Sequence, residues 1–161
     1  MKKYLLILLL LSGISAGAQN VTFTDLTNLA HLGTEDSHKY LTVAHSFKRD
    51  YVQDVNGLTV GNYKCVTDSR KRETVIVGEG IKLNSGDVLR SVYYDTNIQQ
   101  HIVNLIAQVK RSGLKQTFKG VDAFKNIFIF DNDLYNVVIN LNIYDGAGSV
   151  KIRQKEFAGV N

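Results

Sequence analysis

Three alternating apolar stretches near the end of the chain, separated by two very short turns, constrain the fold more than any other feature. The stretches cover roughly 123–130, 135–144 and 149–155. The connections are Asp131-Asn132-Asp133-Leu134 and Asp145-Gly146-Ala147-Gly148. Short runs of these residue types favour hairpins. We therefore predict a three-stranded antiparallel meander.

The two predicted hairpins agree on which side chains share a face. The first turn places Phe128 opposite Val137. The second places Leu141 opposite Ile152. A slip of one residue in either strand would move its apolar side chains to the other face. The buried face should then contain Phe124, Phe128, Phe130, Val137, Ile139, Leu141, Ile143, Val150 and Ile152.

A helix over 97–112 is predicted ahead of this meander. Thr96 and Gln99 have the spacing of a capping box, and Gly113 suits the position just after a helix. Apolar residues recur at helical intervals at Ile98, Ile102, Leu105, Ile106 and Val109. This apolar stripe should lie on the phenylalanine-rich face of the meander.

The first half repeats the same order of elements. Helical material with a break at Gly33 is followed by predicted strands near 60–67, 73–83 and 87–94. We therefore predict an α+β fold made of a duplicated helix-plus-three-stranded antiparallel meander. It would contain about six strands, with the helices packed on one face. Phe47 and Leu114 occupy matching places after the two helices, and so do Tyr51 and Phe118.

The two predicted units span 19–94 and 95–161. A unit of about 70 residues supports only a small core unless a disulfide or a metal helps it. Cys65 is the sole cysteine, so the chain cannot form an internal disulfide. We therefore expect the two units to pack together as one compact domain.

The first eighteen residues have the features of an export signal. Lys2 and Lys3 precede an apolar run over 4–11, and the small residues Ala16-Gly17-Ala18 form an A-x-A cleavage pattern. The run is shorter than the ~20 residues that cross a bilayer. We predict a signal peptide over 1–18, an exported periplasmic or secreted bacterial protein, and no membrane span in the mature chain. An uncleaved anchor is the alternative.

The charge of the chain argues against nucleic acid as a partner. The formal net charge of +4 falls to +2 when Lys2 and Lys3 are removed with the signal. A nucleic-acid-binding face is expected to be strongly basic. We predict a protein partner instead.

Motifs for catalysis, cofactor binding or metal binding are missing from the sequence. It lacks both the G-x-S-x-G turn and the H-E-x-x-H pair. His31, His38 and His45 are seven residues apart, or ~10.5 Å on a continuous helix, which is too far for one zinc ion. His101 is expected at the edge of its helix stripe, and Cys65 is expected to be a buried structural thiol. We therefore predict no catalytic, cofactor-binding or metal-binding residues.

The outward face of the predicted meander is the candidate partner surface. Its apolar part, Ile127, Ile129 and Val138, is larger than a solvated face requires. Either the first unit or a partner covers it, or it is a plain solvated sheet face. The candidate partner-binding residues are Lys125, Ile127, Ile129, Val138, Asn140, Asn142, Tyr144, Lys151, Arg153 and Lys155. In the predicted register, Asn140 lies opposite Arg153 and Asn142 opposite Lys151.

In architecture, this doubled helix-then-sheet plan resembles exported bacterial inhibitor proteins of the β-lactamase-inhibitor type. The resemblance implies an inhibitor. Our leading hypothesis is an exported, non-catalytic protein that binds a protein partner through a sheet face or edge, with an inhibitor or immunity-type role. The alternatives are a self-associating structural protein of the cell envelope, active as a homo-oligomer, and an enzyme of unknown class.

Overall fold

A computed structural model describes residues 21–66 and 71–155 of the chain. The predicted export signal, 1–18, lies outside the described residues. Within the described ranges, every helix is too short or too polar to cross a membrane.

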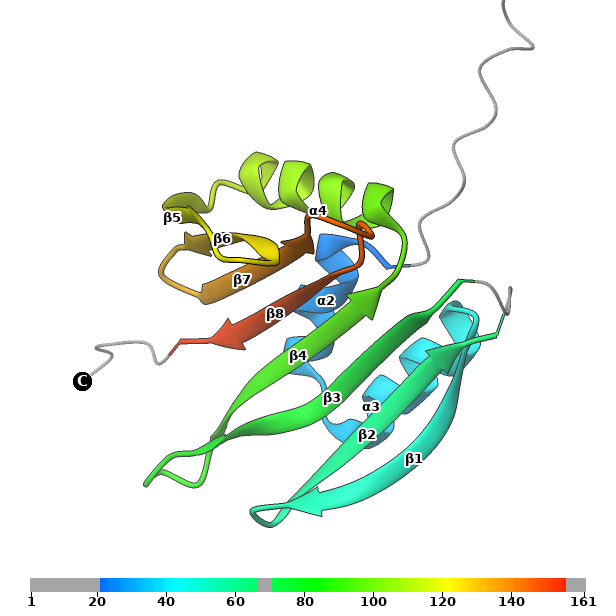
Figure 1. Cartoon of the computed structure of the whole chain (residues 1–161). Helices are drawn as coiled ribbons and strands as arrows, with labels where there is room; N and C mark the ends of the chain where they lie inside the picture. Colours follow the sequence, from blue (N-terminus) through cyan, green and yellow to red (C-terminus); the bar gives the residue numbers. More distant parts are fainter. Residues whose placement is uncertain (1–20, 67–70, 156–161) are drawn as a thin grey trace, which may run out of the picture.

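The chain forms two consecutive helix-and-sheet units. The first contains α2 (Phe23–His31), α3 (Thr34–Lys39), the π-helical turn η1 (Tyr40–Ala44), β1 (Phe47–Val55), β2 (Leu58–Cys65), β3 (Glu73–Lys82) and β4 (Val88–Thr96). The second contains α4 (Gln99–Arg111), β5 (Lys115–Val121), β6 (Lys125–Asp131), β7 (Tyr135–Asn142) and β8 (Gly148–Gln154). Together the strands build one antiparallel sheet in the order β1-β2-β3-β4-β8-β7-β6-β5 (Figure 1).

The predicted α+β class is confirmed, but the strand count is wrong. The sheet has eight strands rather than about six, because each unit has four strands rather than three. The two missed strands, β1 and β5, are the edges of the sheet. Only Phe47 of β1 is buried, and no residue of β5 is. An edge strand with both faces largely in solvent lacks the alternating apolar pattern from which a strand is predicted.

The two units pair their strands in the same register. Between β1 and β2 the register shifts between Arg49 and Tyr51; between β5 and β6 it shifts between Gln116 and Phe118. Each residue of the second pair lies 67 positions after its counterpart in the first. The predicted correspondence of Tyr51 with Phe118 therefore extends to a shared β-bulge. β4 pairs with β8 and joins the units into one sheet.

The predicted buried face of the second unit is correct, although its pairings are displaced. Phe128 lies opposite Ile139 rather than Val137, and Val137 lies opposite Ile152. These displacements are even numbers of residues, so the side chains stay on the predicted face. Two members of the predicted face are wrong. Phe124 lies just before β6 and Ile143 lies just after β7, and they are 65% and 47% exposed.

The core lies between the sheet and the helices. Both major helices pack on β4 and β8, the two central strands. Each apolar side chain that this burial removes from water contributes about 1.5–3 kcal/mol. The helix residues in the core cluster include Leu26, Leu29, Ile102, Leu105 and Val109.

The helix ends differ from prediction in one respect. The predicted break at Gly33 is confirmed, since it is the N-cap of α3. At α4, however, the capping box of Thr96 and Gln99 does not form, because the helix begins two residues later than its spacing requires and Ile98 is the N-cap. The Thr96 hydroxyl accepts a hydrogen bond from the Ile98 amide at 3.1 Å instead.

Candidate functional site

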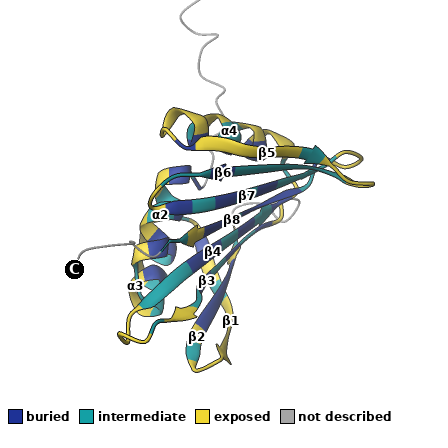
Figure 2. Cartoon of the chain, turned by 90° about the vertical axis from the view of Figure 1, so that its left-hand side faces the viewer, coloured by how far each residue is buried: buried dark blue, intermediate teal, exposed yellow. Residues whose placement is uncertain are grey.

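One face of the sheet carries all the helices, and we call the other the open face. α2 packs on β3, β4 and β8, α3 on β2 and β3, and α4 on β4, β7 and β8. Figure 2 shows the sheet nearly edge-on, with α2 and α3 on one side of it. Among the described residues, no helix or strand packs against the open face. The first unit extends the sheet sideways and does not cover the second.

A row of cross-strand neighbours runs across the open face from one edge of the sheet to the other. Its ends, Tyr51 and Phe118, are about half exposed. Its centre is the pair Tyr93 and Lys151, which joins β4 to β8. In spatial order the row is Tyr51, Asn62, Ile76, Tyr93, Lys151, Val138, Ile129 and Phe118. Most of these side chains are apolar or aromatic.

The predicted partner-binding residues lie on this face or at its ends. β6 carries Lys125, Ile127 and Ile129, β7 carries Val138, Asn140 and Asn142, and β8 carries Lys151 and Arg153. Tyr144 and Lys155 lie just beyond the strands. Ile127, Ile129 and Val138 are half-buried and adjacent, because Ile129 pairs with Val138.

The predicted pairing of the amides with the cations is wrong. Lys151 lies opposite Val138, and Arg153 lies opposite Asn136. The β7–β8 connection covers 143–147 rather than 145–148, because β7 ends at Asn142 and β8 begins at Gly148. The pairing of the two strands is therefore displaced by four residues. As a result, Lys151 stands beside the apolar residues rather than beside Asn142.

Three of the cations on this surface have acidic partners. The Lys151 ammonium lies 3.2 Å from Glu79, that of Lys155 lies 2.7 Å from Asp131, and that of Lys125 lies 3.7 Å from Asp122. Arg153 is different. It is exposed, and no hydrogen bond or ion pair joins its side chain to any described residue.

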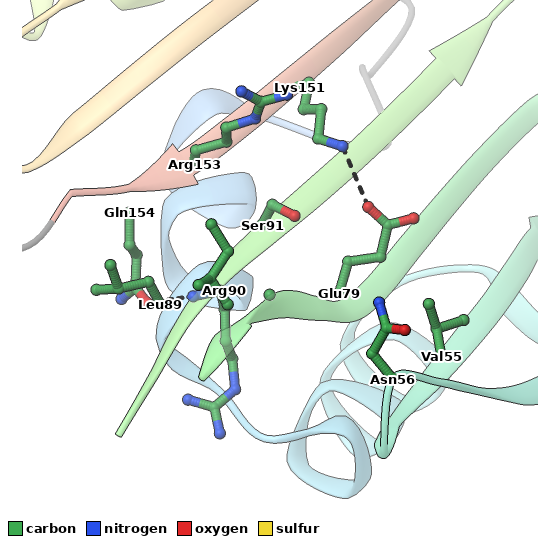
Figure 3. Close-up of a pocket in the computed structure, with 11 residues that line it drawn as sticks. Val55, Asn56, Glu79, Leu89, Arg90, Ser91, Lys151, Arg153 and Gln154 are labelled. Carbon is green, nitrogen blue, oxygen red and sulfur yellow. Dashed lines mark hydrogen bonds and ion pairs between the residues drawn. The ribbon is translucent and has the colours of Figure 1, made fainter. Parts of the chain in front are cut away.

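Two hollows open on this face. One, of about 470 Å³, lies between β3, β4 and β8 and includes Glu79, Ser91 and Arg153 in its lining (Figure 3). The other, of about 350 Å³, lies near the opposite ends of β4 and β8 and includes Tyr93 and Asp95. The first-unit residues of the two hollows were not among the predicted site residues. For Glu79 and Ile81 the reason is that glycines interrupt the alternation of β3.

Asp95 is partly withdrawn from water at the second hollow. Burial raises the pKa of its carboxyl group, and the Arg72 guanidinium, 3.3 Å away, opposes that rise. Burial disfavours the charged form of this carboxyl group, and the neighbouring guanidinium favours it.

An aromatic tip projects from the second unit, where the β5–β6 and β7–β8 turns meet. Phe124 and Tyr144 are 65% and 75% exposed, and their ring centroids are 6.4 Å apart. Side-chain oxygens hold both turns: Asp122 accepts from the Phe124 amide at 2.8 Å, and Asn142 accepts from the Tyr144 amide at 2.8 Å. These turns present exposed rings on a fixed backbone.

A polar cluster lies in the core beneath the first unit. The Tyr94 hydroxyl lies 2.7 Å from Glu73 and 3.2 Å from Nδ1 of His101, and that nitrogen lies 3.4 Å from Glu73. Burial, together with the Glu73 carboxylate, raises the pKa of Tyr94 far above its ordinary value. Sequence analysis placed His101 at the edge of its helix, but only 8% of it is exposed.

This cluster is a structural feature of the core rather than an accessible site. Glu73 is 2% exposed, and neither hollow of the open face is lined by it. Its partners Tyr94 and His101 surround the buried carboxylate with polar groups, and the Tyr94 hydroxyl donates a hydrogen bond to it. A substrate would have to displace the core to reach it.

The three regularly spaced histidines have separate surroundings. His31 contacts the Tyr135 hydroxyl at 2.5 Å, His45 lies 3.5 Å from Asp25, and the His38 ring lies against Tyr63. In the described ranges, no three His, Cys, Asp or Glu side chains are grouped as metal ligands would be.

Comparison with protein-family models, with curated proteins and with solved structures finds no match for this chain. The function of the protein is therefore inferred from its open face.

Proposed function

We propose that this protein is an exported, non-catalytic binding protein that recognises a protein partner through the open face of its second unit. An inhibitor or immunity-type role fits a small module of this kind. The observation that carries the proposal is the adjacent, half-buried group Ile127, Ile129 and Val138, over which no described element of the chain packs.

The arrangement of this surface supports protein binding. Interfaces commonly have an apolar centre that loses its water and a polar rim that stays wet. Here Ile129 and Val138 form the centre, and Lys125, Asn140 and Arg153 lie around them. The aromatic tip adds Tyr144 at one end. Aromatic residues and arginine are the side chains that most often dominate binding energy.

The charge of the rim favours an acidic partner. Lys151, Lys155 and Lys125 each have an acidic neighbour within the chain, so they contribute little net field. Arg153 has no acidic partner among the described residues, so its charge is available to an external group. Complementary charge of this kind chiefly speeds association and fixes the orientation of the partner.

Self-association is the second candidate, and the edges of the sheet favour it. Tyr51 on β1 and Phe118 on β5 are both about half exposed on strands that have an unpaired outer side. Such edges can pair with a second copy. Both edges also carry a bulge, which hinders pairing. Sedimentation at micromolar concentration separates the candidates, because a strict monomer removes the support for self-association.

Capture from cell-envelope extract tests the proposed function. The immobilised protein should retain a specific partner, and the double variant Ile129→Thr with Val138→Thr should lose it. Threonine keeps the branched shape that strands prefer, so the fold should persist. The matched control is Ile76→Thr, because Ile76 holds the position in the first unit that Val138 holds in the second.

Circular dichroism would verify that both variants are folded. Loss of the partner by the double variant but not by Ile76→Thr is the expected result. If the folded double variant captures the same partner as the unaltered protein, the open face of the second unit is not the binding surface.

A further inference from the structure

The hollow between β3, β4 and β8 combines a charged wall with an apolar wall. It measures about 470 Å³. Lys151 and Arg153 come from β8, Ser91 from β4 and Glu79 from β3 (Figure 3). On the apolar side, Val55, Ile81 and Leu89 line the same space.

A bulge in β3 directs Glu79 into this space. The register between β3 and β4 shifts between Ile76 and Glu79, so that Glu79 lies opposite Ser91 on the open face. In an unbroken strand, Glu79 would share the helix-covered face with Val77. Gly78 makes the bulge feasible: its φ is +91°, and a Cβ there would collide with the carbonyl oxygen of Thr59.

Two cations of β8 lie on the charged wall. Lys151 has an acidic partner, and Arg153 has none among the described residues. Glu79 holds Lys151 at 3.2 Å. Figure 3 shows the Arg153 side chain beside that of Lys151 on β8, while the Arg90 guanidinium extends away from this pair. No acid in the described chain lies within ion-pair distance of Arg153. One further carboxylate would complete the charge balance of the group.

We propose that this hollow is a subsite for an acidic side chain of the partner protein that has an apolar residue beside it. The carboxylate binds Arg153 and competes with Glu79 for Lys151, while the apolar neighbour packs against Leu89 and Ile81. Arg153 suits this role because a guanidinium binds a carboxylate through two parallel hydrogen bonds. The inference rests on the proposed function, since it names the partner chemistry that one part of the open face recognises.

The apolar wall indicates that the ligand carries an apolar group beside its carboxylate. Ile81 is 68% exposed and lines the hollow, so a ligand bound there can cover it. Covering it removes apolar surface from water at about 25 cal/mol per Å². An exposed ion pair alone contributes at most about 1 kcal/mol, so the apolar contact is needed for useful affinity.

Glu79 gives the proposal a distinctive test, because it occupies part of the position that the ligand carboxylate would take. Glu79→Gln frees Lys151 and removes a repelling charge. Binding of an acidic ligand should therefore improve, whereas a purely structural role of the Lys151–Glu79 pair predicts no improvement.

Two blocked dipeptides serve as probes, N-acetyl-Asp-Leu-amide and N-acetyl-Asn-Leu-amide, which differ only in the carboxylate. Each would be titrated into the ¹⁵N-labelled protein, following the backbone amide signals of Ser91 and Arg153. The aspartyl peptide should bind with a Kd of roughly a few millimolar, as ligands of this size do. The asparaginyl peptide should bind about fivefold more weakly.

The variants sharpen the result. Arg153→Gln should weaken the aspartyl peptide about fivefold, and Glu79→Gln should strengthen it severalfold. Lys110→Gln, on the exposed side of α4, is the matched control and should change nothing. Equal binding of the two peptides, no binding of either, or unchanged binding by Arg153→Gln would each overturn the subsite.

The outcomes also separate this inference from the proposed function. If the peptides fail but Ile129→Thr with Val138→Thr still abolishes capture, only the subsite is wrong. If the peptides bind as expected but capture does not depend on those two residues, the subsite stands and the larger surface is wrong.

Discussion

The two units share a backbone plan but use different chemistry at equivalent positions in the core. Tyr63 of the first unit corresponds in register to Phe130 of the second, and Tyr94 corresponds to Ile152. All four side chains are fully buried. The two tyrosine hydroxyls of the first unit therefore need partners inside the core, and their counterparts Phe130 and Ile152 do not. The same strand register accommodates either a tyrosine or an apolar residue at these positions, so the register does not by itself determine the polarity of the core.

The outer faces of the two units differ in the same sense at one position. Asn62 of the first unit corresponds to Ile129 of the second, so the unit with the polar core has the more polar open face there. At the centre of the row the difference is reversed, because Tyr93 of the first unit corresponds to Lys151 of the second. The second unit therefore places a cation beside adjacent apolar residues on its open face, and this combination distinguishes it as the proposed binding half.

The largest predicted effect comes from removing a fully buried aromatic ring from the core of the second unit. Phe130→Ala should lower the free energy of unfolding by about 3–5 kcal/mol, because it removes a fully buried ring and leaves a cavity. At the equivalent position, Tyr63→Phe should cost at most about 1.5 kcal/mol, since it removes only a 3.3 Å hydrogen bond with Arg49. Urea denaturation measures both. A Phe130→Ala loss as small as that of Tyr63→Phe would contradict the proposed role of Phe130.

The next effect tests the polar core of the first unit. Tyr94→Phe removes a hydroxyl group that donates to buried Glu73, so it should cost about 1–3 kcal/mol. The equivalent change in the second unit, Ile152→Val, should cost about 0.5–1.5 kcal/mol and should be independent of pH. The same denaturation series compares them. A neutral or stabilising Tyr94→Phe would show that Glu73 does not depend on that hydroxyl.

The smallest effect concerns the starts of the helices, where α2 has a capping box and α4 has an apolar N-cap. Burial opposes ionisation of Asp25, but hydrogen bonds from Thr22 and Tyr40 outweigh it and lower its pKa below 3.8. A lowered folded-state pKa stabilises the protein above the unfolded value, and this contribution is lost as the pH falls through the folded value.

Asp25→Asn should therefore cost about 1 kcal/mol at pH 7 and flatten the loss of stability below pH ~4. Thermal unfolding across pH 2.5 to 7 would follow it, with Asp36→Asn on the exposed side of α3 as control. If Asp25→Asn leaves the loss of stability at low pH unchanged, other carboxyl groups cause that loss.

The sequence is informative where alternation is strong and uninformative where the backbone departs from it. Phe130 and Val137 are on their predicted face because side chains alternate along a strand whatever the turn length. Their partners were displaced because turn residues do not fix the length of a connection. β1 and β5 were missed because edge strands need not alternate.

The candidate site was predictable to a similar extent. Lys151 and Arg153 followed from the alternation of a single strand. Glu79 did not, because its direction depends on the bulge at Gly78. The contact of His101 with Glu73 joins residues on α4 and β3, and nothing local to either segment indicates it.

The most direct test of the central claim is a comparison of amide signals in the ¹⁵N-labelled protein with and without the partner that it captures. Binding through the open face of the second unit predicts that the signals of β6, β7 and β8 change most, with those of Ile129 and Val138 among them. The signals of α2 and α4, on the covered face, should stay in place. Changes confined to the helices, or to the edge strand β1, would contradict the account.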